Sequence, residues 1–395
     1  MTRSNGDTRT TGTPGRGRPV GDAKFSGAND ADGERTTGAV AVPATRSATA
    51  SAIVSPDAEQ IARAVDLLRA GELVGMPTET VYGLAADALN VAAVTRIFAA
   101  KGRPADHPLI VHLPDAEHLP RWARAIPKDA LALARAFWPG PLTLILKRED
   151  GVPDAVTGGQ DTVGLRVPDH PVALALLRAF DSGIAAPSAN RFGRISPTTA
   201  GHVAEELGDR VALILNGGAC EVGIESTILD LSRDAPVILR PGAISADDIA
   251  RVIGRRPQVR SALEEAPGGE QDQPEPHDQP RVSGSLAAHY APRTPLQLAP
   301  ASQLVEVAAT LAGEGSRVAV LAHGCADPHD ARLLWRAAAT DPVRYAHDLY
   351  ANLRDLDACG ADFIIVEALP DGTEWHPIRD RLGRAAVGSG DADET

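Results

Sequence analysis

The sequence contains little cysteine and little lysine. Its 395 residues include three cysteines, Cys220, Cys325 and Cys359, which lie far apart and have no second Cys or His at the spacing of a zinc site. This pattern implies neither a disulfide framework nor a structural metal. Lysine occurs four times against 35 arginines, so a lysine in a candidate site is more informative than an arginine.

Positive charge and long hydrophobic runs are also scarce. The net charge of −13 and the aromatic content of 4% argue against a broad nucleic-acid-binding surface, which needs basic patches. An anionic substrate would therefore meet a few local cations. No run approaches the ~18 apolar residues of a membrane span, and the first residues lack the apolar region of a signal peptide. We therefore expect a cytoplasmic protein.

The familiar signatures of nucleotide binding and serine hydrolysis are absent. No lysine follows a glycine, which excludes a Walker A motif, and Gly15-Arg16-Gly17 is not preceded by a strand pattern or followed by a helix pattern. Ser188 lies in Ala-Pro-Ser-Ala-Asn rather than in Gly-x-Ser-x-Gly, so a nucleophilic serine is not favoured. Any nucleotide site in this chain would therefore be built from other residues.

The composition, 43% hydrophobic and 23% charged, is typical of a globular protein, and the length suggests two domains. Residues 1–50, rich in Gly, Thr, Ala and Arg, predict a disordered tail. Residues 264–280 are rich in Pro, Gly, Gln and acid, which is typical of a linker. We therefore expect a first domain at 51–260, a linker at 261–294 and a smaller second domain at 295–388.

Both domains alternate strand and helix patterns, which indicates an α/β fold. Ser55-Pro56-Asp57 predicts a helix start with a cap, an N1 proline and a first-turn acid, and Gly71 predicts its end. The first domain has further helices expected at 91–100 and 246–253, and strands at 73–76, 109–113, 142–146, 163–167, 211–215, 227–231 and 237–239. The second domain has helices expected near 304–311, 345–356 and 378–385, and strands at 318–321 and 363–366.

Two segments of the first domain are candidates for anion binding. Residues 77–84 place hydroxyl groups and a glycine directly after a buried strand, where α/β sheets bind ligands, although a simple capped turn fits the same pattern. Lys101 and Arg103 form a compact cationic pair suited to phosphate. For Lys101 alone, an ordinary helix end before Gly102 is an equally good explanation.

Polar residues also alternate along two predicted strands. The period of two places Thr162, Gly164 and Arg166 on one face, which fits either a ligand site or a solvated outer face. His112 lies opposite Val111, and a lone histidine in such a strand is more often structural than catalytic. Small hydroxyl and amide groups at 186–190, 196–198 and 223–227 can bind phosphate or form ordinary turns.

Taken in order, these segments resemble the YrdC-like domain of the threonylcarbamoyl-AMP synthase family. After the linker, residues 289–292 (His-Tyr-Ala-Pro) and the second α/β unit look like the long, two-domain form of that family. The fold implied is a twisted open mixed sheet with helices, followed by a smaller Rossmann-like domain. The resemblance rests on the motifs PTETVYGL, KGRP with HPLIVHL, WPGPLTLIL, TVGLRVP, APSAN, ISPT, ESTI and LRPG.

The resemblance also implies roles for individual residues. Lys101 and Arg103 would be catalytic because they neutralise phosphate charge, and Mg²⁺ would arrive with ATP rather than on protein ligands. The threonine pocket would be lined by Thr80, His112, Arg166, Ala186 and Ser226. ATP would be held by Arg103, His107, Thr162, Ser188, Asn190, Ser196, Arg240 and Tyr290, with His107 standing where the family more often has Asn.

The reaction implied is the conversion of L-threonine, bicarbonate and ATP to threonylcarbamoyl-AMP and pyrophosphate. The product would pass to a tRNA threonylcarbamoyl transferase that modifies tRNA next to the anticodon. Tyr290 would close the ATP site as part of a lid, unless His289 and Tyr290 only dock the second domain. The alternative functions are a binding module for double-stranded RNA or tRNA, and transfer of the carbamoyl group to another acceptor amine.

Overall fold

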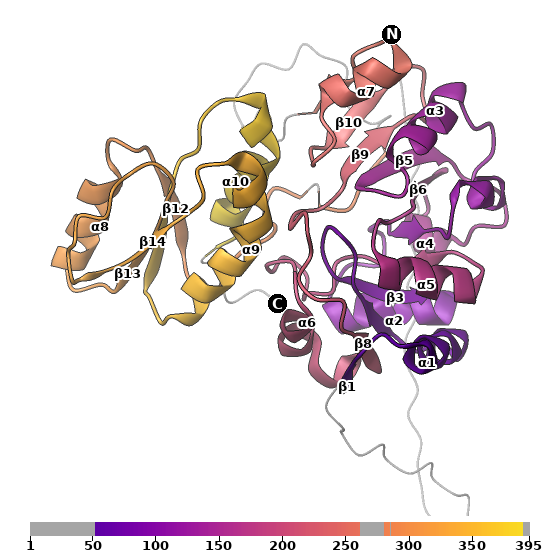
Figure 1. The fold of residues 1–395 in the computed structure, drawn as a ribbon, viewed down its shortest axis with the longest axis horizontal. Helices are drawn as coiled ribbons and strands as arrows, with labels where there is room; N and C mark the ends of the chain where they lie inside the picture. Colours follow the sequence, from indigo (N-terminus) through magenta and orange to yellow (C-terminus); the bar gives the residue numbers. More distant parts are fainter. Residues whose placement is uncertain (1–51, 261–279, 285, 390–395) are drawn as a thin grey trace, which may run out of the picture. The chain divides into compact units, whose positions relative to one another are not determined.

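A computed structural model of the chain describes residues 52–260, 280–284 and 286–389 (Figure 1). These residues form an 11-stranded sheet and a four-stranded sheet, which belong to the same compact unit. The predicted tail at 1–50 and most of the predicted linker lie outside the described residues. Among the residues that the structure does describe, no helix is long and apolar enough to cross a membrane.

The larger sheet is mixed, as the sequence predicted. Parallel pairs such as β4 with β6 and β5 with β9 alternate with antiparallel pairs such as β2 with β3 and β5 with β6. The strands follow the spatial order β1 (Ala52–Val54), β8 (Leu213–Leu215), β2 (Val74–Met76), β3 (Gly83–Asp87), β7 (Ile184–Ala185), β4 (Ile110–His112), β6 (Thr162–Arg166), β5 (Leu142–Lys147), β9 (Thr227–Asp230), β10 (Val237–Arg240) and β11 (Gln258–Val259).

Alternate residues of the strands enter hydrophobic cores on the two faces of this sheet. Ala85 and Leu213 pack with helices α1 and α5, whereas Leu84 and Ile214 pack in the core that includes residues of α2, α3, α6 and α7. The helices are α1 (Ala58–Arg69), α2 (Val91–Lys101), α3 (Lys128–Phe137), α4 (Asp154–Thr157), α5 (Pro171–Phe180), α6 (Ala200–Leu207) and α7 (Ala246–Ile253), with 3-10 turns η1 (Ala116–Arg121) and η2 (Gly208–Arg210).

The predicted start of the first helix was wrong by a few residues. The N-cap is Asp57, whose carboxylate accepts a hydrogen bond from the Gln60 amide at 2.9 Å, so α1 begins at Ala58 and Pro56 lies outside it. Asp and Ser are about equally good N-cap residues, so residue type alone could not decide between Asp57 and Ser55. Gly71 follows the last turn with a φ of +78°, as expected for a glycine that ends a helix.

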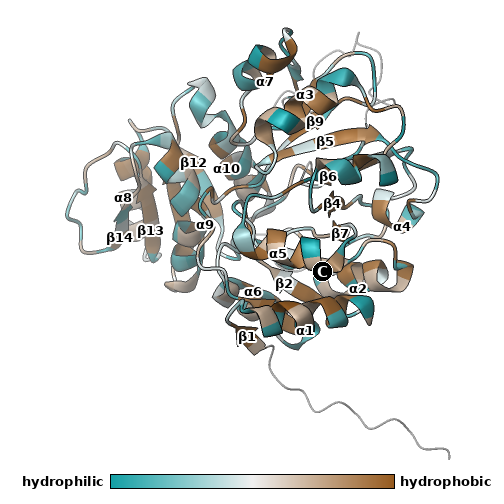
Figure 2. Ribbon diagram, turned by 45° about the vertical axis from the view of Figure 1, so that its right-hand side comes forward, coloured by the Kyte–Doolittle hydropathy of each residue, from teal (hydrophilic) through white to brown (hydrophobic). Residues whose placement is uncertain are grey.

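The smaller sheet is wholly parallel. Its order is β12 (Leu296–Ala299), β15 (Phe363–Glu367), β13 (Val318–Ala322) and β14 (Leu333–Ala337). Helix α8 (Leu304–Gly313) covers one face, and α9 (Pro342–Ala358) and α10 (His376–Gly388) cover the other, with turn η4 (Thr373–Trp375) before α10 (Figure 1). Strand β13 is hydrophobic along its length, as expected for a strand buried on both faces (Figure 2). The Rossmann-like expectation is thereby met.

Candidate active site

A pocket lies beside the middle strands of the larger sheet. It is lined by the loop between β2 and β3, by the ends of β4 and β6, by the segments after β7 and around β9 and β10, and by the segments 283–284 and 289–290. The pocket brings together every residue predicted for the threonine site and three of those predicted for ATP. These are Thr80, His112, Arg166, Ala186 and Ser226, with Ser188, Arg240 and Tyr290.

The hydroxyl loop after β2 is a tight turn that returns the chain into the antiparallel strand β3. Thr78 organises the turn, because its Oγ1 donates to the Val81 carbonyl at 2.6 Å and accepts from the Thr80 and Val81 amides, each at 3.2 Å. Gly83 then passes close to the segment after β7, where a Cβ would lie 3.0 Å from Ala186 Cβ. The loop is therefore a turn capped by a hydroxyl group, but it leads into strand β3 and not into the helix that the capped-turn alternative required.

Arg166 lies at the end of β6 and is almost fully buried. Its Nη2 donates to Glu79 Oε1 at 2.5 Å, its Nη1 to Thr80 Oγ1 at 2.9 Å and its Nε to the Gly140 carbonyl at 3.2 Å. The polar face of this strand is thus not a solvated outer face, and that alternative was wrong. Glu79 fixes the guanidinium at the pocket wall, because a buried cation needs a charged partner.

His112 lies on the neighbouring strand β4, next to Arg166, with which it is paired in register. Burial, together with the positive charge of Arg166, lowers the pKa of His112 to about 3. Its Nδ1 atom has no hydrogen-bond partner among the residues that the structure describes. A neutral imidazole with a free polar atom can hydrogen-bond a ligand without adding charge to the site.

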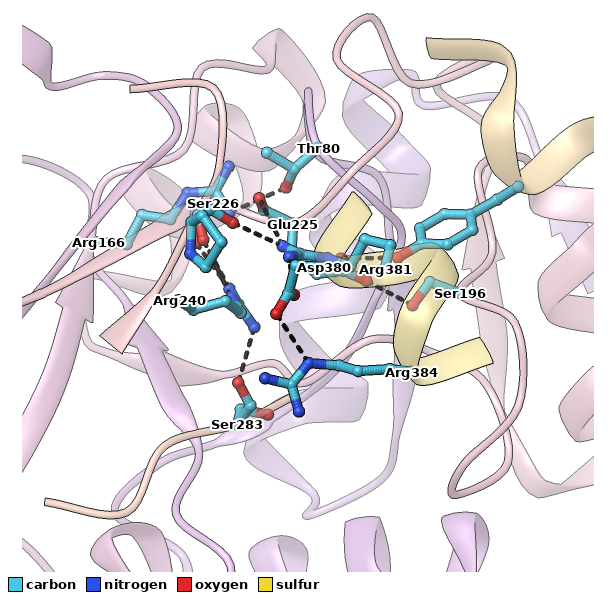
Figure 3. Close-up of polar contacts among 12 residues, drawn as sticks. Thr80, Arg166, Ser196, Glu225, Ser226, Arg240, Ser283, Asp380, Arg381 and Arg384 are labelled. Atoms are coloured by element: carbon cyan, nitrogen blue, oxygen red, sulfur yellow. Dashed lines mark hydrogen bonds and ion pairs between the residues drawn. The ribbon is translucent and has the colours of Figure 1, made fainter. Parts of the chain in front are cut away.

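Arg240, at the end of β10, supplies a second buried cation to the pocket. Its Nη2 donates to Ser226 Oγ at 3.1 Å, and its Nη1 donates to the Ser283 carbonyl at 2.9 Å (Figure 3). The Ser226 hydroxyl also lies 2.8 Å from that of Thr143. Ser226 is therefore held between two polar side chains at the pocket wall.

The segments 283–284 and 289–290 close one side of the pocket, and Tyr290 is central to them. Its ring is buried, its backbone φ is +63°, and its hydroxyl has no hydrogen-bond partner among the described residues. Gly284 makes room for it, because a Cβ on Gly284 would lie 2.2 Å from the Tyr290 hydroxyl oxygen. Tyr290 also stacks on Tyr350 of α9, with ring centroids 5.8 Å apart. The tyrosine therefore contacts the pocket and the second domain together.

Arg103 lies just behind the pocket lining. Its Nη1 and Nη2 each lie 3.2 Å from Ser283 Oγ, and Nη2 donates to the Pro108 carbonyl at 3.0 Å. Burial is the main reason that the pKa of Arg103 falls to about 10. The guanidinium remains charged at neutral pH and contributes positive potential at the wall made by Ser283.

Lys101 also lies behind the lining, at the end of α2, where Gly102 has a φ of +65°. Its Nζ donates to the carbonyls of Ser188 and Asn190, at 2.5 and 2.6 Å. Burial, reinforced by the charge of Arg103, holds the pKa of Lys101 well below its ordinary value. The lysine thus shapes the loop that carries Ser188 into the pocket, and the helix-end explanation describes its backbone correctly.

The other predicted ATP residues are not part of the lining. Asn190 donates to the Arg191 and Arg194 carbonyls, and Ser196 donates to Glu225 Oε1 at 2.6 Å. His107 packs edge-on against Phe192, with ring centroids 5.5 Å apart. Thr162 lines a smaller hollow beside Val282. The structure therefore divides the predicted ATP set into residues that line the pocket and residues that lie outside its lining.

Sequence reasoning gave no role to three charged residues: Glu225, which lines the pocket, and Glu79 and Arg381, which bond to lining residues. Glu79 and Glu225 lie inside the recognised motifs, but an acidic side chain in an anion site gave no interpretable signal without its partner. Arg381 belongs to α10 in the second domain, and its Nε donates to Glu225 Oε2 at 2.8 Å. The two residues are 156 positions apart along the chain, which places that contact beyond any local pattern.

Comparison with known proteins places the chain in a family. A family model described as "Telomere recombination", for Sua5, YciO and YrdC proteins, matches residues 66–242, and a model of the threonylcarbamoyl-AMP synthase C-terminal domain matches residues 244–387. Threonylcarbamoyl-AMP synthase of Bacillus subtilis is 42% identical over 342 residues, which cover 85% of this chain and 95% of that protein. The chain belongs to the threonylcarbamoyl-AMP synthase family.

Other members of the threonylcarbamoyl-AMP synthase family give the same result. The Pyrococcus abyssi enzyme is 39% identical over 329 residues, covering 82% of this chain and 93% of that protein. A crystal structure of Pyrococcus abyssi Sua5 complexed with L-threonine matches with a TM-score of 0.76 at 37% identity, over 84% of this chain and 95% of that chain. The family and the two-part α/β fold predicted from the sequence are confirmed.

Proposed function

We propose that this chain is an L-threonylcarbamoyladenylate synthase, which converts L-threonine, bicarbonate and ATP to threonylcarbamoyl-AMP and pyrophosphate. One observation carries the proposal: a single pocket is lined by two buried arginines, Arg166 and Arg240, with the Ser226 hydroxyl also in the lining. Such a site suits a substrate with a carboxylate and a substrate with phosphates. Family membership with named synthases supports the same reaction.

L-Threonine would occupy the part of the pocket beside β4 and β6. The Arg166 guanidinium would face the threonine carboxylate, while Glu79 holds it in place from the other side. Thr80 and the neutral His112 would hydrogen-bond the polar groups of the amino acid. Ala186 would contribute an apolar wall.

ATP would occupy the part of the pocket beside Ser188, Arg240 and Tyr290. Arg240 would contact the phosphates directly, and Arg103 would add positive potential from behind Ser283. Lys101 would act through the Ser188–Asn190 backbone that it holds. The remaining predicted ATP residues, which lie outside the lining, would likewise act without touching ATP.

The chemistry needs positioning and charge neutralisation more than a protein nucleophile. The threonine amine takes up carbon dioxide derived from bicarbonate and loses a proton, which gives a carbamate. A carbamate oxygen then attacks the α-phosphorus of ATP, and the bond from that phosphorus to the bridging oxygen breaks. Pyrophosphate leaves with the bonding electrons, and Arg240 and Arg103 would stabilise the charge that develops on the phosphates.

Mg²⁺ would enter with ATP. Within residues 52–260, 280–284 and 286–389, no group of three or more His, Cys, Asp or Glu side chains is arranged to hold a metal ion. The two carboxylates at the pocket are each paired with an arginine, Glu79 with Arg166 and Glu225 with Arg381. We therefore infer that phosphate oxygens and water hold the metal, which would reduce the negative charge of the leaving group.

The product is a reactive mixed anhydride, so the reaction calls for an acceptor. We infer that a tRNA threonylcarbamoyl transferase receives it for modification of tRNA next to the anticodon, and that this takes place in the cytoplasm. The net charge of −13 supports hand-over to a partner rather than binding of tRNA on a broad surface of this chain.

The test is incubation of the purified chain with ATP, Mg²⁺, bicarbonate and each amino acid in turn. Release of pyrophosphate should depend on L-threonine and on bicarbonate, and mass spectrometry should detect threonylcarbamoyl-AMP. Omission of bicarbonate is the matched control, because ordinary aminoacyl adenylation would not need it. Affinity for RNA without turnover, or turnover with another amine, would overturn the proposal.

A further inference from the structure

One side chain of the second domain contacts three segments that form the wall of the pocket. Arg381, on α10, donates through Nε to Glu225 Oε2 at 2.8 Å and through Nη2 to the Pro241 carbonyl at 3.0 Å. Its guanidinium carbon lies 5.3 Å from the centroid of the Tyr290 ring. Glu225 precedes Ser226 and Pro241 follows Arg240, so Arg381 contacts the immediate neighbours of two lining residues and contacts a third directly.

The Glu225 carboxylate bonds to three side chains, which with Glu225 form a buried polar cluster: Ser196, Tyr350 and Arg381. Its Oε1 accepts from Ser196 at 2.6 Å, and its Oε2 accepts from Tyr350 at 2.9 Å as well as from Arg381 (Figure 3). Burial alone would raise the pKa of Glu225, but the charges of Arg381 and Arg240 outweigh it and lower the pKa to about 2. The carboxylate is therefore ionised and fixed at neutral pH.

The two loops that Arg381 contacts are packed backbone against backbone. A Cβ on Gly242 would lie 2.4 Å from the Thr227 amide nitrogen and 2.8 Å from the Glu225 carbonyl oxygen. Arg240 joins the loops again, through its bonds to Ser226. A shift at Glu225 would thus be felt at both Ser226 and Arg240, because Gly242 packs directly against the backbone of residues 225–227.

Arg381 is itself fixed from the side of the second domain. Its Nη1 donates to Asp380 Oδ2 at 2.7 Å, and Asp380 Oδ1 accepts from Arg384 Nε at 3.0 Å. Arg384 also donates to the Leu286 carbonyl and accepts from the His289 amide through its own carbonyl. The cluster therefore continues into the segment that carries Tyr290.

We propose that Arg381 is a positioning residue for the adenylation site: by holding Glu225, Pro241 and Tyr290, it sets the geometry of Ser226 and Arg240 around the substrates. The inference rests on the proposed function of the pocket. The second domain then takes part in catalysis. Its Arg381 does not touch the substrates but holds the residues that do.

The test compares Arg381→Lys, Arg381→Ala and Tyr350→Phe in the full-length chain. A lysine keeps the charge but cannot reach Glu225 and the Pro241 carbonyl together, because an ammonium lacks the planar fork. We expect kcat/KM for threonine to fall about 10- to 100-fold in Arg381→Lys, with a higher KM for both substrates. Tyr350→Phe keeps the ring packing and removes one bond to Glu225, so it should show a smaller change in the same direction.

Two further measurements separate positioning from mere folding stability. Loss of folded protein lowers the apparent kcat but leaves KM unchanged, so a raised KM identifies displaced side chains. Added guanidinium ion should restore part of the activity of Arg381→Ala while leaving the unmodified chain unaffected. The matched control is Arg379→Gln, on the same helix, whose side chain pairs with the exposed Asp371 and should leave both KM values within twofold.

Unchanged KM values in Arg381→Lys and Tyr350→Phe, with a lower melting temperature only, would overturn the inference. If Arg381→Ala does not fold, the other two variants carry the test. Absence of threonine-dependent pyrophosphate release by the unmodified chain would instead overturn the proposed function, and the inference with it.

Discussion

The Arg240 guanidinium contacts both the backbone carbonyl and the side-chain hydroxyl of Ser226. The Nε and Nη2 atoms of Arg240 lie 3.1 and 3.0 Å from the Ser226 carbonyl oxygen, and Nη2 lies 3.1 Å from Ser226 Oγ. Through Nη1 the same guanidinium reaches the Ser283 carbonyl. One side chain thus connects the β9 loop with the segment before Tyr290, and both line the pocket.

Arg240→Lys should therefore reduce activity although it keeps the charge. An ammonium group cannot replace the fork that contacts Ser226 and Ser283 together, so the transition state should lose about 2 to 4 kcal/mol of stabilisation. Steady-state pyrophosphate release measures the change in kcat/KM for ATP. Arg251→Lys is the matched control, since its side chain is exposed on α7. Similar kinetics for the two variants would show that the fork is unimportant.

Arg166→Ala should raise the KM for threonine much more than the KM for ATP. The Arg166 guanidinium lies on the β4 and β6 side of the pocket, beside Thr80 and His112. Without it, the threonine carboxylate would lose its charged partner. Initial rates at varied concentrations of each substrate distinguish the two effects. Equal increases in both constants would mean that threonine binds elsewhere in the pocket.

Glu79→Ala should destabilise the fold by about 3 to 5 kcal/mol, because it leaves the buried Arg166 guanidinium without a charged partner. Urea unfolding followed by circular dichroism measures the loss. Asp150→Ala is the matched control, since it breaks the exposed ion pair with Arg124 and should cost less than about 1 kcal/mol. A loss at Glu79 as small as that at Asp150 would contradict the predicted importance of the buried pair.

Gly284→Ala tests whether Tyr290 closes the ATP site. The added Cβ would lie 2.2 Å from the tyrosine hydroxyl oxygen, and the φ of +80° disfavours any other residue, so Tyr290 should be displaced from the pocket. The KM for ATP should rise and free threonylcarbamoyl-AMP should hydrolyse faster during turnover. Gly313→Ala, on α8, is the control, because a Cβ added there would meet nothing within 4 Å beyond its own helix. Normal kinetics in Gly284→Ala would exclude the lid.

The stability of the protein should fall as the pH decreases below about 6.5, because of the buried histidines. Burial is the main reason that the pKa values of His112 and His289 are about 3 in the folded chain, so the unfolded chain binds protons that the folded chain does not. Each group lowers the free energy of unfolding by up to about 1.4 kcal/mol per pH unit below 6.5. His112→Asn should reduce this slope between pH 6.5 and 4, measured by urea unfolding, and a slope unchanged from the parent would contradict it. Above pH 7.5 the two curves should run parallel.

Long, periodic hydrophobic segments could be predicted from the sequence with accurate bounds. The helix at 246–253 was predicted as observed, the strand at 142–146 ends one residue too early, and the strand at 163–167 is shifted by one residue at both ends. Other strands gave no usable signal: β3, Gly-Leu-Ala-Ala-Asp, has no β-branched residue, and β7 has only two residues. These strands become regular only through their neighbours in the sheet.

The candidate site shows the same division. The hydroxyl residues and arginines that line the pocket could be predicted from the motifs, because their side chains are recognisable as ligand-binding groups without knowledge of the fold. The sequence could not show which cations reach the pocket and which stay behind it, as Lys101 and Arg103 do, since that depends on where Ser188 and Ser283 lie. It also could not show the carboxylates that hold Arg166 and Arg381, because long-range pairing has no local pattern.

The Glu225–Arg381 pair has a consequence for how the protein unfolds. If the second domain unfolded by itself, Glu225 would lose its bonds to Arg381 and Tyr350, and the first domain would lose the stabilisation that these contacts give it. The two domains should therefore unfold together in one cooperative transition, although each has its own sheet. A single calorimetric peak, with equal calorimetric and van't Hoff enthalpies, is the expected signature.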